Sequence, residues 1–202
     1  MKHTTVDREC AVSPVVGVML MLVVTIIIAA VVSAFSGGLA GTQQKAPQAS
    51  IDVKIDSSSA NQTIFTLLSG DSIQTKDLAI VTYYKNKAGS IYKNKQTVAS
   101  PASVLYSTHT TTPNRVPFLN DMRYGYNYLN PDAVDFGNYT WKSGDTLSTG
   151  NTAGTADLLA INDTATIHGI RDPDFGPGSV VDIKILHVPS GQYIFNKEVI
   201  VK

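Results

Sequence analysis

The sequence predicts an α+β protein in which a long apolar N-terminal helix precedes an all-β domain with an Ig-like sandwich architecture. Two observations lead to this fold class. An almost continuous apolar stretch covers residues 12–35, and no strand is that long. Short segments of alternating apolar and polar residues, separated by turn residues, recur from residue 51 to the end of the chain. The 202 residues suffice for one ordinary domain and an appended segment.

The apolar stretch has the length of a membrane-spanning helix. No charged residue occurs from residue 11 to residue 42. At about 1.5 Å per residue, a helix over 12–35 reaches roughly 36 Å, which is enough to cross a bilayer. A secretory signal peptide is the alternative, but its apolar region usually covers only about 7–15 residues. We therefore expect a helix over residues 11–41 that stays on the mature protein, followed by a polar linker over 42–50.

Small residues recur at every fourth position in the second half of this helix. Such a spacing lets two helices approach closely, although small residues are also common in any apolar helix. We interpret them as helix-packing residues. They form two series, Ala29, Ser33, Gly37 and Gly41 in one and Ala30, Ala34 and Gly38 in the other.

The rest of the chain, residues 51–202, is predicted as the β-sandwich domain. Its clearest strand is 51–55, where apolar and charged residues alternate, and its clearest hairpin is 180–201, with Pro189, Ser190 and Gly191 at the turn. The segments predicted as strands are residues 51–55, 63–69, 77–84, 91–92, 103–107, 139–141, 156–161, 180–188 and 192–201.

Composition excludes several function classes. Acidic and basic residues are equal at 16 each, which argues against a nucleic-acid partner. Cys10 is the single cysteine, so neither an intrachain disulfide nor a cysteine-based zinc site is possible. The four histidines are scattered, and His187 shares a strand face with apolar residues, which favours a packed or an edge-exposed side chain over a catalytic one. We expect no cofactor and no metal.

No recognised catalytic motif occurs in the sequence. An exported enzyme with an aspartate pair stays a disfavoured alternative, because sequence does not bring two of the nine aspartates between residues 121 and 182 together. The segment 172–178 has the carboxylates and carbonyls for a cation, but a Pro/Gly-rich loop before a strand is the preferred interpretation. The prediction is therefore that the protein is not an enzyme.

The N-terminal residues resemble a known family. The run Ala-Val-Ser-Pro-Val-Val-Gly-Val-Met-Leu-Met at 11–21, continued by the apolar residues 23–35, resembles the N-terminal domain of archaeal type IV pilins. The Val-Ser-Pro-Val-Val-Gly core at 12–17 is its most specific part. Residues 70–73 and 187–191 are similar to β-domains of pilin-like proteins from methanogens.

The resemblance implies a class III signal peptide. In this family a prepilin peptidase removes a polar leader on the cytoplasmic side, after a charged and a small residue, and leaves the apolar helix on the mature protein. Here the leader is residues 1–10, and Glu9 and Cys10 fit that pattern. The resemblance leaves two cuts open, one that makes Ala11 the first residue and one that makes Val12 the first.

One departure from the bacterial relatives concerns assembly. Bacterial type IV pilins have a glutamate near the mature N-terminus that helps assembly, whereas this chain has no acidic residue between Glu9 and Asp52. The resemblance then implies assembly through apolar packing. A net charge of +4 over residues 76–95 and of −6 over 121–182 also suggests contacts between subunits, although solvated strand faces explain it more simply.

The function implied by the resemblance is a structural subunit of an extracellular archaeal type IV pilus, an adhesive filament at the cell surface. Its expected partners are further copies of itself, the prepilin peptidase and pilus assembly machinery, and the membrane before assembly. The alternative is a membrane-anchored cell-surface binding protein that does not polymerise. Export would also permit N-glycosylation at three sequons, those of Asn61, Asn138 and Asn162.

Overall fold

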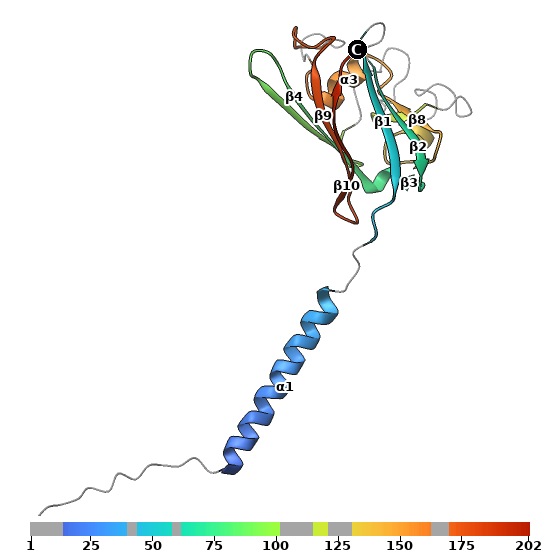
Figure 1. The fold of residues 1–202 in the computed structure, drawn as a ribbon. Helices are drawn as coiled ribbons and strands as arrows, with labels where there is room; N and C mark the ends of the chain where they lie inside the picture. Colours follow the sequence, from blue (N-terminus) through green and yellow to red (C-terminus); the bar gives the residue numbers. More distant parts are fainter. Residues whose placement is uncertain (1–13, 40–43, 58–61, 102–114, 121–130, 163–169) are drawn as a thin grey trace, which may run out of the picture. The chain divides into compact units, whose positions relative to one another are not determined.

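The computed structural model describes residues 14–39, 44–57, 62–101, 115–120, 131–162 and 170–202. The chain divides into two compact units, Met1–Gln43 and Gln44–Lys202. Each unit is described by itself below. Their elements are labelled in Figure 1.

The described part of the first unit is one helix, α1 (Pro14–Leu39). Proline is well tolerated as its first residue, because the N–H that proline lacks has no partner in the first turn of any helix. The side chains described along α1, from Pro14 to Phe35, are all exposed within this unit. The helix predicted from the apolar stretch is confirmed.

The second unit is built mainly from antiparallel strands. Two four-stranded sheets have the orders β1-β2-β8-β6 and β10-β9-β4-β5, and β3 and β7 form a two-stranded sheet. The prediction of an α+β fold with an apolar helix before a β domain is thus confirmed. The strands are β1 (Ala49–Asp56), β2 (Gln62–Gly70), β3 (Ile73–Gln74), β4 (Leu78–Lys85), β5 (Ile91–Gln96), β6 (Phe118–Leu119), β7 (Thr140–Trp141), β8 (Thr146–Ser148), β9 (Val180–His187) and β10 (Gln192–Ile200). The helices are α2 (Pro131–Val134) and α3 (Thr152–Leu159), with a 3₁₀ turn at Thr75–Asp77.

One hydrophobic core joins the two four-stranded sheets. Phe65 of β2 and Ile183 of β9 are both fully buried in the same cluster, together with Trp141 of β7. Alternation along β9 places every second side chain in this core, as the sequence predicts. His187 is at the end of that series and is buried, so of the two predicted positions the side chain has the packed one and not the edge-exposed one.

The first and last strands connect the two sheets at one edge. Ile55 of β1 forms an isolated parallel bridge with Val201, just after β10. The amide of Lys202 donates to the Ile55 carbonyl at 3.0 Å, and the amide of Ser57 donates to the Lys202 carbonyl at 2.8 Å. The C-terminal residues are therefore part of the sandwich rather than a tail.

One predicted strand is wrong. Residues 156–161 are not extended, because Ala156 and Leu159 belong to helix α3, which starts at Thr152. Two local features define the helix. The Asn151 side chain caps its first turn, and Ala160 ends it in the left-handed conformation, with φ 56°. The apolar residues that suggested a strand are buried in the core all the same.

The other predicted strands differ from the structure mainly in their lengths. β5 extends to Gln96, beyond the predicted 91–92, and β3, β6 and β8 were not predicted. These three strands are only two or three residues long, which leaves too little alternation to detect. The predicted strand at 103–107 lies outside the described residues.

Candidate functional site

The first candidate surface is the apolar helix α1. Its stretch Pro14–Phe35, 22 residues, is long and apolar enough to cross a membrane by length and composition. At about 1.5 Å per residue it spans roughly 33 Å, against about 30 Å for the hydrocarbon core of a bilayer. A helix that packs one side on a soluble core presents polar residues on its other side, and α1 has no charged residue on any side.

The one threonine of this helix needs no partner outside it. The hydroxyl of Thr25 donates to the carbonyl of Leu22 at 2.9 Å. Apolar surroundings offer no hydrogen bonds, so a hydroxyl there must be satisfied within the protein. The surface of α1 around Thr25 is therefore compatible both with lipid and with the apolar side of another helix.

The small residues predicted for helix packing lie in the C-terminal half of α1. Ala29, Ala30, Ser33 and Ala34 are exposed on the helix, and Gly37 and Gly38 lie within its last turn. Gly41 lies outside the described residues. A step of four residues turns the helix by about 40° beyond one full turn, so each series stays on one side over two turns. The two series lie on adjacent sides, about 100° apart, and small side chains on a helix let a second helix approach closely.

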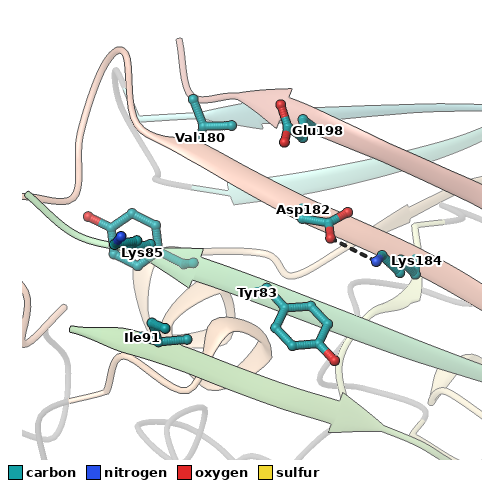
Figure 2. Close-up of a pocket in the computed structure, with 8 residues that line it drawn as sticks. Tyr83, Lys85, Ile91, Val180, Asp182, Lys184 and Glu198 are labelled. Atoms are coloured by element: carbon teal, nitrogen blue, oxygen red, sulfur yellow. Dashed lines mark ion pairs between the residues drawn. The ribbon is translucent and has the colours of Figure 1, made fainter. Parts of the chain in front are cut away.

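The second candidate surface is the outer face of the β10-β9-β4-β5 sheet, which we call the outer sheet face. A shallow pocket of about 450 Å³ lies on it. Figure 2 shows the side chains that line this pocket, which come from all four strands. The amine of Lys184 lies 3.0 Å from a carboxylate oxygen of Asp182, and this bond is the main reason why the pKa of Lys184 is raised. The amines of Lys93 and Lys184 lie 5.1 and 5.5 Å from the centre of the Tyr83 ring. The ring therefore sits between two cations.

Charge is distributed unevenly across the outer sheet face. In the strand register, Glu198 pairs with Asp182, Asp182 with Tyr83, and Tyr83 with Lys93. The row thus runs from two acids on β10 and β9 to a lysine on β5. Side chains two residues apart in a strand share a face. Lys95 therefore lies on the same face as Lys93, and Lys85 lies on the same face as Tyr83, which pairs with Lys93. Two copies of this face are therefore complementary in charge when the acidic end of the row in one copy lies against the basic end in the other.

The two charged segments seen in the sequence contribute unequally. The lysine-rich segment 76–95 supplies the basic side of the outer sheet face through β4 and β5. The acidic segment 121–182 supplies only Asp182 among the described residues. Of the others described, Asp157 belongs to α3, and Asp135, Asp145, Asp172 and Asp174 lie outside the helices and strands. Glu198 was not predicted for this surface, because it lies on β10, outside the acidic segment 121–182.

The remaining candidate sites are individual residues. The predicted cleavage region, Glu9, Cys10, Ala11 and Val12, lies outside the described residues, as does Asn61. Asn138 and Asn162 are both exposed. The side-chain amide of Asn162 donates to a carboxylate oxygen of Asp157 at 3.0 Å.

Groups suited to catalysis are not brought together in the part of the chain that the structure describes. Among the described residues, no three histidine, cysteine, aspartate or glutamate side chains gather at one place. The Nδ1 atom of His187 lies 2.8 Å from the hydroxyl of Ser190, in the turn that follows β9, which gives this buried ring a structural partner.

Comparison with known proteins adds one finding. Residues 10–51 match the family model described as archaeal type IV pilin, N-terminal. The matched segment contains α1, the residues that follow it and the first residues of β1. No curated protein and no solved structure matches the chain.

Proposed function

We propose that this chain, whose N-terminal segment is that of an archaeal type IV pilin, is a structural subunit of an extracellular pilus. The single observation that carries the proposal is the surface of α1, which is apolar on every side and belongs to the matched segment. A helix of this kind needs apolar surroundings on all sides, and both a bilayer and the centre of a helical bundle provide them.

The proposed sequence of events starts with a precursor in the membrane. The leader, residues 1–10, lies inside, and the β-sandwich domain, residues 51–202, lies outside. A prepilin peptidase cuts after Cys10 or Ala11, and the mature helix, residues 11–41, then leaves the bilayer for the filament core. Both places are apolar, so this transfer exposes little apolar surface to water.

Assembly then rests on helix packing. No acidic residue between Glu9 and Asp52 is available to pair with a neighbouring N-terminus. We propose that the two series of small residues in α1 provide the close contacts instead. Each subunit contacts its neighbours through two different surfaces, and a head-to-tail contact that does not close into a ring generates an open filament.

The β domain is proposed to face outward, joined to the helix by the linker 42–50. Its exposed asparagines Asn138 and Asn162 are proposed glycosylation sites, together with Asn61. Pilins are structural proteins, and we propose no catalytic role and no cofactor for this one.

The test is the N-terminus of the mature protein, determined by mass spectrometry on the fraction sheared from cells that express it. We expect filaments in that fraction and a chain that begins at Ala11 or Val12. A chain that begins near residue 40 would contradict the proposal, because the helix would have been discarded. An intact Met1 on a protein that stays in the membrane fraction would favour the alternative, a membrane-anchored surface protein that does not polymerise.

A further inference from the structure

A carboxylate in the loop before β9 is buried without a full set of partners. Asp172 is only 3% exposed. Its Oδ1 atom accepts a hydrogen bond from the amide of Asp174 at 2.9 Å, whereas its Oδ2 atom is buried and has no hydrogen-bond partner. No ion pair among the described residues includes Asp172.

Burying a carboxylate oxygen without a partner is energetically unfavourable. Removing a carboxylate oxygen from water costs free energy that only a hydrogen bond, a proton or a cation returns. Nearly all buried polar side-chain atoms in folded proteins have a partner, so an orphaned carboxylate oxygen indicates a missing group. In this loop the missing group is a proton or a cation.

The surroundings of Asp172 supply further oxygen atoms. Asp174 adds a second carboxylate two residues later, and Pro173 and Pro177 have no backbone N–H, so the loop is rich in acceptors relative to donors. The phenol of Tyr84 is close enough to both carboxylates to respond to them. Burial is the main cause of its raised pKa, and the charges of Asp172 and Asp174 act in the same direction.

The rest of the loop holds its shape by hydrogen bonds of its own. The amide of Gly176 donates to the hydroxyl of Ser179 at 3.1 Å, and the amide of Gly178 donates to the Val201 carbonyl at 2.9 Å. The ring of Phe175 meets the Tyr84 ring edge-on, with 5.3 Å between their centres. The backbone around Asp172 is thus tied to β4 and to the C-terminal strand region, which favours a preformed site.

We propose that the loop of residues 172–179 binds a calcium ion through Asp172 Oδ2, with the carboxylate of Asp174 and backbone carbonyls as further ligands. Calcium prefers carboxylate and carbonyl oxygens and accepts irregular geometry, whereas zinc prefers cysteine and histidine. Only two carboxylates contribute, so the dissociation constant is expected on the order of 10⁻⁴–10⁻³ M, as in extracellular calcium modules. The proposal does not depend on the function proposed above.

The experiment measures the thermal unfolding of the full chain in detergent micelles, with CaCl2, with MgCl2 or with EGTA. The fluorescence of Trp141, the single tryptophan, reports on the β domain because its side chain is buried. At a calcium concentration about ten times Kd, the midpoint should rise by about 3–6 °C. Calorimetric titration with CaCl2 measures the binding itself.

Three variants make the result specific. Asp172→Asn keeps an oxygen for the Asp174 amide and removes the charge, and it should abolish the calcium-dependent shift. Asp174→Asn should weaken calcium binding at least several-fold and gives a second readout if the first variant does not fold. Asp52→Asn is the matched control, since Asp52 contacts Lys54 at 3.2 Å on the exposed part of β1, and it should bind calcium like the parent chain.

Three outcomes would overturn the proposal. One is an equal calcium shift in Asp172→Asn and the parent chain, which places the ion elsewhere. Another is no calcium effect combined with a more stable Asp172→Asn variant, which means that the carboxyl is buried with a proton. An equal shift with magnesium alone would contradict the assignment to calcium.

Discussion

Gln48 and Asp71 bind each other in both directions at the start of the β domain. The amide of Asp71 donates to the Gln48 carbonyl at 2.8 Å, and the amide of Gln48 donates to Oδ2 of Asp71 at 2.9 Å. Gly70, the last residue of β2, lies at φ +119°, and a Cβ atom there would be 2.2 Å from the Gln48 carbonyl oxygen. The strand that follows the linker is therefore fixed to the β2 turn at its first residues.

This contact predicts a large cost for a side chain at residue 70. Gly70→Ala should lower the free energy of unfolding by about 2 kcal/mol or more, because it adds both backbone strain and a clash with Gln48. Gly89→Ala is the matched control. Its φ is +89°, but nothing lies within 4 Å of the added Cβ, so it carries the strain without the clash. If urea unfolding shows the same loss of unfolding free energy in both variants, the contact with Gln48 adds nothing to the backbone strain and the prediction is wrong.

The first turn of helix α3 is capped by the side chain of Asn151. The Oδ1 atom of Asn151 accepts from the amides of Ala153 at 2.9 Å and Gly154 at 3.1 Å. Asn151→Ala should lower the free energy of unfolding by about 1 kcal/mol. Asn151→Asp should lower it much less, because a carboxylate also accepts hydrogen bonds from those amides. The midpoints of urea unfolding measure both. A loss as large in the aspartate variant as in the alanine variant would contradict the capping role.

Helix α3 also shows which elements a local sequence pattern does not predict. The helix α1 and the strands β1, β9 and β10 are predictable, because each shows its own hydrophobic pattern over many residues. Helix α3 is short, and side chains from other strands bind a carbonyl group near its end. The hydroxyl of Thr82 donates to the Leu158 carbonyl at 2.8 Å, and the side-chain amide of Asn94 donates to the same carbonyl at 3.0 Å. These partners lie far away in the sequence, so no local pattern contains them.

The candidate surfaces divide in the same way. The charge and hydropathy of successive residues suffice to predict the surface of α1, because every side chain described along this helix is exposed within its unit. The outer sheet face depends on register, which places Tyr83 beside Asp182 from the other end of the domain. The buried carboxylate of Asp172 is visible in the sequence only as one of two nearby acids, because burial is a property of the folded loop.

Large side chains in the small-residue series should block assembly without affecting membrane insertion. Ala29→Leu combined with Ser33→Leu fills the side that we propose meets another helix, and we expect at least a tenfold loss of filaments from the sheared fraction, since helices no longer approach closely. Ile28→Leu combined with Val32→Leu is the control, because it exchanges large apolar residues on a neighbouring side. Normal amounts of filament in the first variant would contradict close packing along that series.

Charge reversal on the outer sheet face should weaken contacts between neighbouring β domains in a filament. Lys93→Glu makes both ends of the row acidic, because Glu198 and Asp182 already occupy the other end, and we expect filaments that dissociate at lower salt concentrations. Combining it with Glu198→Lys exchanges the two ends of the row and should restore stability. Lys142→Glu makes the same charge change at an exposed turn and should leave filaments unchanged. No rescue in the exchanged pair, measured by electron microscopy across a salt series, would rule out this contact.

Burial of Tyr139 predicts a loss of stability in alkaline solution. Its hydroxyl donates to the Pro117 carbonyl at 3.2 Å, and burial, followed by the charges of Asp135 and Asp145, raises its pKa well above the usual 10.0. The folded state thus holds this proton more tightly than the unfolded state. The resulting stability is complete below pH 10 and is lost as the pH rises above it, because the unfolded chain then releases the proton.

Phenylalanine at this position separates the proton from the packing. Tyr139→Phe should lower the free energy of unfolding near neutral pH by about 1 kcal/mol, through the lost hydrogen bond, but should make the decline above pH 10 shallower. Tyr193→Phe is the control, since that ring is 55% exposed, and its profile should follow the parent chain. Urea unfolding at a series of pH values from 8 to 11 measures all three. An equally steep alkaline decline in Tyr139→Phe would assign the pH dependence to other groups.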